Sequence, residues 1–371
     1  MTIPVSTSGT RPIVAITGLN GFISTHVAIK FLKEGWDVRG SFRSAKSSDK
    51  VLKDEEHALA PWVKEGRLQV AIVPDLTGDL TELLKDVQAV AHLAAPIDMQ
   101  VNTSWEDFKN PTIDGTLNVL DQAKQTTSIK AVTLMSSLAA MFDPAPANGG
   151  WNKIYDESDW FPYDEEYVKA IDASTNPFAP VLWYCAAKKY LEFAVNRWVE
   201  DEKPAWPVSI ICPPMVYGPA LQASNPADLN SFRTPSADLI TLTKGKDTPL
   251  PTPPSLIMVD VRDVAQAFFN AVDKKKSGRF AVAGPAYTYQ GFANIMRRLR
   301  PDLEQYFAVG NPSDPEVPAK GPNGENHWSV NASKSIKELG VEYTPLEKTI
   351  SDALDHLDKI GVFKLAPGAW A

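Results

Sequence analysis

Tyr184 and Lys188 stand four residues apart in the stretch WYCAAK, residues 183–188. On an α-helix this spacing places both side chains on one face. A tyrosine normally has a pKa near ~10, and a neighbouring ammonium stabilises the phenolate and lowers that pKa. Tyr184 could therefore give or take a proton near neutral pH. The same spacing also arises by chance between two surface residues of a helix.

Two serines, Ser136 and Ser137, follow the apolar run AVTLM, residues 131–135. Side chains at the carboxyl ends of parallel strands line the ligand crevice of an α/β sheet. A serine hydroxyl there can hydrogen-bond a substrate carbonyl, although it can also simply stabilise a turn. Another apolar run ends in Ala94 and Ala95, whose small side chains would let a cofactor lie flat across the sheet.

Short apolar runs alternate with helical stretches over residues 13–212. Runs such as LQVAIV show almost no polar alternation, which is typical of parallel strands covered by helices on both faces. The alternation predicts an α/β fold with a doubly wound, Rossmann-type parallel sheet. We expect strands at 13–17, 37–42, 68–73, 89–93, 131–135 and 208–212, and helices within 26–33, 58–64, 80–84, 116–124 and 186–199.

The stretch TGLNGFIS, residues 17–24, follows the first of these strands. Gly18 would allow a tight turn, and Gly21 would let the backbone approach a pyrophosphate at the helix N-terminus. Ser24 stands where a dinucleotide-binding loop often has its last glycine, and it is small enough for close helix–strand packing. The alternative is a tight turn that binds no ligand.

The end of the second strand reads VRGSFRSAKSSDK and carries Arg39, Arg43, Lys46 and Lys50, with no acid before Asp49. An NAD enzyme usually presents a carboxylate there to the ribose 2′-hydroxyl. A guanidinium can instead bind a 2′-phosphate through two hydrogen bonds. The sequence therefore favours NADP(H) over NAD, against the alternative of a solvated basic loop.

After Pro213 prolines become dense and periodicity fades, which indicates a smaller, loop-rich lobe. A last helix should begin at the capping box Thr344-Pro345-Leu346-Glu347, with proline at its first position, and end at Gly361. The expected division is a disordered tail at 1–11, a Rossmann domain at 12–212 with part of 256–283 packed back on it, and a substrate lobe from 213–255 and 284–371.

The composition excludes several classes of protein. With 37 Lys and Arg against 45 Asp and Glu, the net charge of −8 gives no electrostatic footprint for nucleic acid. No apolar run approaches the ~20 residues of a membrane span, and the N-terminus does not resemble a signal peptide. Cys185 and Cys212 lack neighbours at metal-ligand spacing, so we expect no metal and a reducing, cytoplasmic environment.

These motifs together resemble the extended short-chain dehydrogenase/reductases. More narrowly, the chain is similar to their dihydroflavonol-reductase-like branch, which includes NADPH-dependent methylglyoxal and carbonyl reductases of fungi. The resemblance runs from residue 13 to residue 361 and departs from the family pattern at Ser24 and in a long, tryptophan-rich stretch at 149–183, which can border the pocket. Its motifs, in chain order, are TGLNGFIS, the strand end with Arg43, Asp75-Leu76, HLAAP, IDGTLNVL, SSLAA, YCAAK, PPMVYGP, MVDVRDVAQAF and LGVEYTPLEKTI.

The resemblance implies a role for each matching residue. Ser137 would hold the substrate carbonyl, Tyr184 would be the general acid, and Lys188 would bind the nicotinamide ribose and tune Tyr184. Packing in the hydrophobic core would explain the aromatic residues Phe142, Tyr217 and Phe232 as well as a place in the substrate pocket does. The NADP(H) contacts would come from Thr17, Gly18, Asn20, Gly21, Phe22, Ile23, Arg43, Lys46, Asp75, Leu76, Leu93, Ala94, Ala95, Ser136, Tyr184, Lys188, Pro213 and Val216, and the substrate contacts from Pro96, Phe142, Tyr217 and Phe232.

The expected activity is NADPH-dependent reduction of an aldehyde or ketone to an alcohol, by a monomer or homodimer that acts on a small carbonyl compound. His26 and His92 are expected to serve packing rather than catalysis. Two alternatives stay open at this point. One is a hydroxysteroid dehydrogenase or nucleotide-sugar epimerase of the same fold, and the other is a non-enzymatic NADP-binding sensor.

Overall fold

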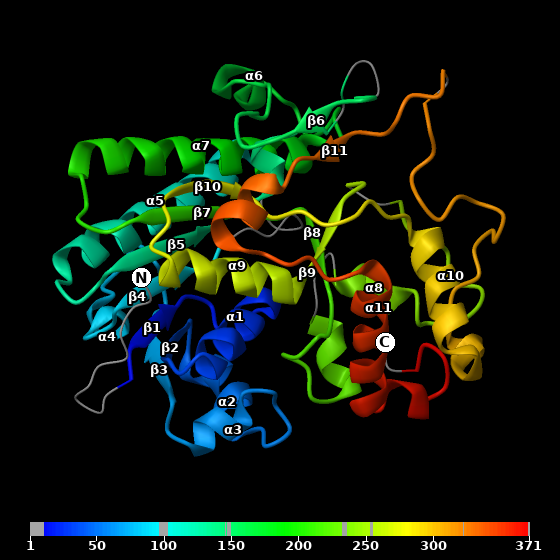
Figure 1. Cartoon of the computed structure of the whole chain (residues 1–371), viewed down its shortest axis with the longest axis horizontal. Helices are drawn as coiled ribbons and strands as arrows, with labels where there is room; N and C mark the ends of the chain where they lie inside the picture. Colours follow the sequence, from blue (N-terminus) through cyan, green and yellow to red (C-terminus); the bar gives the residue numbers. More distant parts are fainter. Residues whose placement is uncertain are drawn as a thin grey trace.

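Seven parallel strands form the central sheet, in the order β10-β7-β5-β4-β1-β2-β3 (Figure 1). The computed structural model describes residues 11–95, 103–144, 146, 150–231, 236–252, 255–321 and 323–369. The expected doubly wound α/β class is confirmed. The strands are β1 (Ile13–Ile16), β2 (Asp37–Phe42), β3 (Leu68–Ile72), β4 (Ala89–His92), β5 (Ala131–Met135), β7 (Val208–Cys212) and β10 (Gly278–Ala281).

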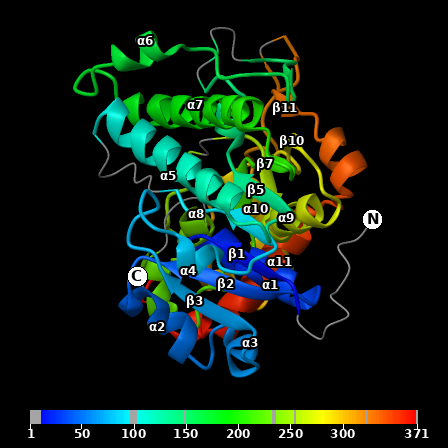
Figure 2. The same cartoon turned by 90° about the vertical axis from the view of Figure 1, so that its left-hand side faces the viewer.

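Helices cover both faces of this sheet. On one face α5 (Trp105–Gln125) packs along α7 (Ala179–Glu202), and Figure 2 shows the two side by side. On the other face α1 (Phe22–Lys33) packs against α9 (Val261–Asp273). All four residues of β4 are buried, because strands in the middle of such a sheet meet helices above and below. Among the residues that the structure describes, no helix is long and apolar enough to cross a membrane.

The remaining elements are short. They lie mostly at the margins of the sheet and in the connections between its strands. They are α2 (Ala45–Lys53), α3 (Ala60–Lys64), α4 (Thr81–Leu84) and α6 (Glu165–Lys169), the 3₁₀ segments η1 (Leu138–Ala140), η2 (Pro226–Ser231), η3 (Pro301–Tyr306) and η5 (Val362–Lys364), and the π-helical turn η4 (Ser335–Leu339).

Strand order reverses between β1 and β4, so the chain leaves these neighbouring strands in opposite directions across the sheet. In open α/β sheets the ligand crevice lies outside the carboxyl ends of the strands at such a point. TGLNGFIS follows β1, and Leu93, Ala94 and Ala95 follow β4. The topology therefore brings the two motifs to one place.

Two helices are longer than their apolar patterns predict. α5 begins at Trp105, because Ser104 and Asp107 form a reciprocal capping box, and it continues through Pro111. α7 begins at Ala179 with a proline in its first turn. Tyr184 consequently lies inside α7, beyond its first turn, where its orientation is fixed by flanking helix.

A second lobe packs around its own apolar core, beside the sheet in Figure 1. Its elements are β8 (Met215–Tyr217), β9 (Met258–Asp260), α8 (Ser236–Thr241), α10 (Tyr289–Leu299) and α11 (Leu346–Lys359). The division proposed from the sequence stays a prediction, and part of the 284–371 segment does not pack in this core. Trp328, Leu339 and Val341 pack in the clusters of the sheet instead, and β11 (Ser329–Val330) pairs with β6 (Ile154–Tyr155).

The expected capping box of the last helix is wrong. Pro345 is the N-cap residue of α11 rather than its first helical residue, and no side chain in this described segment caps the helix. Thr344 turns away because its hydroxyl and its N–H donate hydrogen bonds to the Asp263 carboxylate, at 2.7 and 2.9 Å. The C-terminal expectation is confirmed, since the helix gives way at Gly361, where φ is +90°.

Candidate active site

The turn after β1 is built around Gly18, whose φ is +67°. A Cβ on Gly18 would lie 3.1 Å from the Cβ of Ala94, so the two strand ends approach each other closely. The Gly18 N–H donates a hydrogen bond to the Ser41 hydroxyl at 3.0 Å, which ties the turn to β2. A glycine is needed here both for the backbone conformation and for the space.

Helix α1 starts at this turn with Gly21 as its N-cap residue. Within residues 11–95, no side chain caps the helix, and its first turn contains no acidic residue. Asn20 is exposed, while Gly21, Phe22 and Ile23 are partly exposed. A helix N-terminus of this kind presents backbone N–H groups and a positive dipole end to an anion. The backbone N–H groups at the start of α1 therefore suit the pyrophosphate that the sequence predicts at this turn.

Thr17 lies beneath the turn, fully buried. Its oxygen accepts hydrogen bonds from the N–H groups of Leu93 and Ala94, both at 2.9 Å. Because both lone pairs are then used, the hydroxyl proton points to Nδ1 of His92, also at 2.9 Å. His92 then carries its proton on Nε2, which faces the Thr116 hydroxyl at 3.1 Å. Thr17 thus connects the end of β1 to the residues that follow β4, on the inner side of the turn.

The two histidines with functional potential are both held as structural groups. Burial lowers the pKa of His92 to about 3 and that of His26 to about 4. His26 bonds through Nε2 to the carbonyl of Pro219 at 2.8 Å. Both rings are neutral at neutral pH, which agrees with the packing role expected for them.

The four cationic side chains near the end of β2 differ in their contacts: two are held by neighbouring side chains and two are exposed. Arg39 donates hydrogen bonds to Gln69 at 2.9 and 2.8 Å, and Lys50 pairs with Asp54 and Asp228. Arg43 and Lys46 are exposed at the start of α2. Their exposure fits the predicted contact of Arg43 and Lys46 with a 2′-phosphate, which stays a prediction.

The end of β3 lies close to Arg43. Asp75 is exposed, and its pKa lies below the ordinary value because it accepts hydrogen bonds from Thr77, with a smaller contribution from the charge of Arg43. Leu76 packs toward Gly115 of α5, where an added Cβ would lie 3.2 Å from the Cβ of Leu76. These positions fit the predicted adenine contacts, which stay a prediction.

Ser137, Tyr184 and Lys188 meet where β5 ends against α7. Ser137 caps η1, accepting a hydrogen bond from the N–H of Ala139 at 3.1 Å, and its side chain also bonds to Tyr184. The Lys188 ammonium nitrogen lies 5.9 Å from the centre of the Tyr184 ring. The structure thus brings together three side chains that the sequence places up to 51 residues apart.

Burial dominates the pKa values of this group. It raises the pKa of Tyr184 to about 12, although the hydrogen bond from Ser137 acts in the opposite direction. It lowers the pKa of Lys188 to about 8, while the charge of Glu192 acts to raise it. The pKa of Tyr184 is therefore raised and not lowered as expected, because desolvation of the phenolate is the largest influence on it.

Ser136 is buried and its hydroxyl is not free to point into the crevice, while its predicted cofactor contact stays a prediction. The hydroxyl instead donates a hydrogen bond to the buried carboxylate of Glu192. Sequence reasoning missed Glu192, although it continues the spacing of Tyr184 and Lys188 by another four residues on α7. That regular repeat was the available signal.

Pro213 and Val216 are both buried at the carboxyl side of β7. The Pro213 carbonyl accepts a hydrogen bond from the N–H of Leu138 at 2.8 Å, which holds the turn that contains Ser137. Val216 lies in β8. Their predicted contact with the nicotinamide stays a prediction.

The four residues predicted to contact the substrate lie in different environments. Pro96 and Phe232 lie outside the described residues. Phe142 is nearly buried and stacks on Trp328 with ring centres 5.4 Å apart. Tyr217 is fully buried in the core of the second lobe, and its hydroxyl lies 3.0 Å from those of Tyr287 and Tyr289. The rings of Tyr287 and Phe292 pack against Tyr217, which favours core packing, and its predicted substrate contact stays a prediction.

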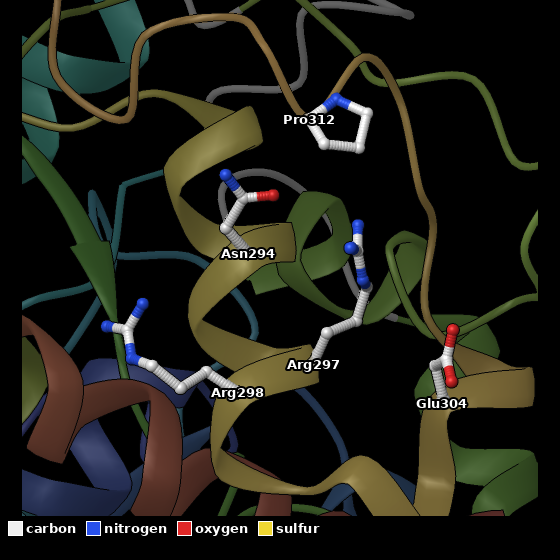
Figure 3. Close-up of a pocket in the computed structure, with 5 residues that line it drawn as sticks. All are labelled: Asn294, Arg297, Arg298, Glu304 and Pro312. Carbon is white, nitrogen blue, oxygen red and sulfur yellow. The ribbon is translucent and has the colours of Figure 1, made fainter.

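A surface hollow of about 470 Å³ lies elsewhere, on the second lobe (Figure 3). Its lining comes from α10, η3 and the following loop, and none of the predicted site residues contributes to it. It is separate from the crevice at the strand ends. The lining residues are Asn294, Arg297, Arg298, Glu304 and Pro312.

Comparison with known proteins now identifies the family. The profile of the NAD dependent epimerase/dehydratase family matches residues 14–284. An uncharacterized oxidoreductase of Schizosaccharomyces pombe is 31% identical, over 93% of this chain and 96% of that protein. The chain belongs to the NAD dependent epimerase/dehydratase family, that is, to the extended short-chain dehydrogenase/reductases.

Relatives with assigned activities narrow the resemblance. The NADPH-dependent methylglyoxal reductase of Saccharomyces cerevisiae is 27% identical, over 93% of this chain and 98% of that enzyme. The solved structure of the yeast methylglyoxal/isovaleraldehyde reductase Gre2 complexed with NADPH superimposes with a TM-score of 0.76 at 26% identity, covering 95% of this chain and 99% of that one. The expected similarity to fungal reductases is confirmed.

Proposed function

We propose that this chain is an NADPH-dependent carbonyl reductase that converts an aldehyde or ketone to an alcohol. The observation that carries the proposal is the meeting of Ser137, Tyr184 and Lys188 at the end of β5. The relatives named above add support, since one is named for NADPH-dependent reduction of methylglyoxal and one was solved with NADPH.

The residues present fit NADPH on two independent features. The uncapped N-terminus of α1, from Gly21 to Ile23, would hold the pyrophosphate through backbone N–H groups. Arg43 and Lys46 would hold the 2′-phosphate, because both are exposed and cationic where an NAD enzyme has a carboxylate. When bound, NADPH supplies the hydride for the reduction.

The protein's own residues would orient the substrate and move the proton. Ser137 would donate a hydrogen bond to the carbonyl oxygen and hold it beside Tyr184. The raised pKa of Tyr184 keeps the proton on the phenol oxygen at neutral pH until the substrate oxygen becomes basic enough to take it. The Lys188 ammonium then stabilises the charge left on Tyr184.

The alternatives are less well supported. The family profile includes epimerases, but those use NAD in the usual case, and Arg43 replaces the carboxylate that NAD favours. A sensor without activity has no need for the Ser137, Tyr184 and Lys188 arrangement. Both cysteines are buried and unpaired, which supports the proposal of a reducing, cytoplasmic location.

Replacement of Tyr184 tests the proposed reaction. Wild-type protein is screened with aldehydes, α-dicarbonyls, β-ketoesters and aryl ketones while NADPH absorbance is followed. We expect Tyr184→Phe to lower kcat by at least about 100-fold while NADPH still binds. Tyr190→Phe, on the same helix α7, is the matched control and should stay active. A Tyr184→Phe protein that reduces carbonyls at the wild-type rate would show that the mechanism is wrong.

A further inference from the structure

A buried ion pair lies directly behind the proposed catalytic group. The Nε atom of Arg279, on β10, is 2.5 Å from Oε2 of Glu192, on α7, and their side chains are only 9% and 1% exposed. Charges this deeply buried are rare and costly unless other groups satisfy them. The hydrogen bonds of Glu192 and Arg279 with their surroundings therefore indicate the role of the pair.

The described contacts of the Glu192 carboxylate are with two hydrogen-bond donors and one cation. Ser136 donates through its hydroxyl, Cys212 donates through its thiol at 3.5 Å, and Arg279 contributes its charge. Burial raises the pKa of Glu192, and Arg279 is the largest influence in the opposite direction. These donors and this permanent cation favour the ionised carboxylate and act against the effect of burial.

Arg279 fixes the other side of the pair to the backbone. Its guanidinium donates to the carbonyls of Glu157 at 3.0 Å, Asp159 at 2.6 Å and Ala140 at 3.3 Å, and it lies 3.7 Å from the ring centre of Trp160. Ala140 ends the η1 turn that Ser137 begins. The pair therefore connects α7 to both ends of the Ser136–Ala140 segment.

Lys188 lies one helical turn before Glu192 on α7. The other titratable groups that influence or contact it are Tyr184 on α7, His92 on β4 and Cys212 on β7. His92 is neutral, and burial raises the pKa of Cys212, so that thiol is neutral as well. Among these described groups, Glu192 is the one paired with a permanent cation, and its charge acts to raise the pKa of Lys188.

We propose that Glu192, held by Arg279, is a positioning residue that keeps Lys188 charged and fixes Ser137 against Tyr184. It does so without touching the substrate. The Ser136 hydrogen bond sets the strand end from which Ser137 projects, and Glu192 follows Lys188 by one turn of α7. This inference rests on the proposed function for its effect on turnover, but its effect on Lys188 does not depend on turnover.

The test uses Glu192→Gln, with Glu165→Gln as the matched control. Glu165 also accepts from a lysine, Lys109 at 2.7 Å, but it lies on α6 away from Lys188. Two quantities are measured for each variant: the pH at which NADPH binding is half lost on the alkaline side, by fluorescence titration, and kcat across the same pH range.

We expect Glu192→Gln to move the alkaline midpoint of NADPH binding down by about one pH unit, because Lys188 loses the charge that holds its proton. We also expect kcat to fall by about tenfold or more. Glu165→Gln should change neither. An unmoved midpoint in folded Glu192→Gln would overturn the proposal.

A double variant, Glu192→Leu with Arg279→Met, keeps the test decisive if Glu192→Gln does not fold. Replacing both partners of a buried pair by apolar residues often preserves stability. We expect this variant to fold but to keep the lowered midpoint and the low kcat. Recovery of the wild-type midpoint would show that the pair is only structural. If Tyr184→Phe stays active while the midpoint moves, the proposed reaction fails and this inference stands.

Discussion

The hydroxyl of Ser24 donates a hydrogen bond to the carbonyl of Gly18 at 2.6 Å and lies 3.0 Å from the carbonyl of Gly21. Ser24 is buried in the first turn of α1. It therefore does more than take the place of a small glycine. It fastens the helix to the loop that precedes it, at the point where a pyrophosphate would meet the backbone.

Replacement of Ser24 should loosen this loop. We expect Ser24→Ala to lower the free energy of unfolding by about 1 kcal/mol, the usual net value of one hydrogen bond. We expect Ser24→Gly, which introduces the glycine common in related loops, to lose at least as much, because glycine also weakens a helix. Urea denaturation and NADPH titration would measure both effects. A Ser24→Gly protein more stable than wild type would contradict this role.

The sheet and the Tyr184–Lys188 pair could be predicted because both depend on short-range patterns, whereas the family resemblance placed Ser137 with them. Apolar runs without alternation identify buried strands, and the spacing of Tyr184 and Lys188 defines a helix face. The Glu192–Arg279 pair could not be predicted, because it joins residues 87 positions apart whose contact depends on β10 entering the sheet. For the same reason the sequence did not show that Thr344 bonds Asp263 instead of capping α11.

Arg43 should determine cofactor preference. We expect Arg43→Ala to weaken NADPH binding by about 10- to 100-fold, as removal of a charge-assisted hydrogen bond does, and to leave NADH binding almost unchanged. Arg39→Ala is the control, since its guanidinium is held by Gln69 on the neighbouring strand. Fluorescence titration with both cofactors measures the ratio. Equal losses for NADPH and NADH would mean that Arg43 does not meet the 2′-phosphate.

Gly40 is required by the packing of Leu19 against β2. A Cβ added to Gly40 would lie 2.1 Å from Cδ2 and 2.7 Å from Cβ of Leu19, which is fully buried. We expect Gly40→Ala to lower the free energy of unfolding by about 1–3 kcal/mol through overpacking. Gly78→Ala is the control, because its added Cβ would meet only the Asp75 carbonyl at 3.4 Å. Urea denaturation that finds the two variants equally stable would contradict this reading of the loop.

Acid should destabilise the protein through its buried histidines. Burial lowers the pKa of His26 to about 4, and that of His57, on which the charge of Lys50 also acts, to about 4. It lowers the pKa of His92 to about 3, whereas in the unfolded chain all three titrate near ~6.5. A lowered folded-state pKa means that the unfolded chain takes up the protons first. The stabilisation is complete above pH ~6.5 and is lost as the pH falls toward the folded-state values.

Each such histidine contributes a slope of about 1.4 kcal/mol per pH unit within that window. Asp263 acts in the opposite direction, because burial raises its folded-state pKa to about 6 and its protonation favours the folded chain. Burial also lowers the pKa of His356 and raises those of Asp238 and Glu192, so four histidines act against three carboxyls, and we expect a net loss of stability on acidification. Urea denaturation at pH 7.5 and pH 5 measures the loss, and His26→Gln should reduce it by removing one titrating ring. A protein equally stable at both pH values would show that these histidines are protonated as easily when folded as when unfolded.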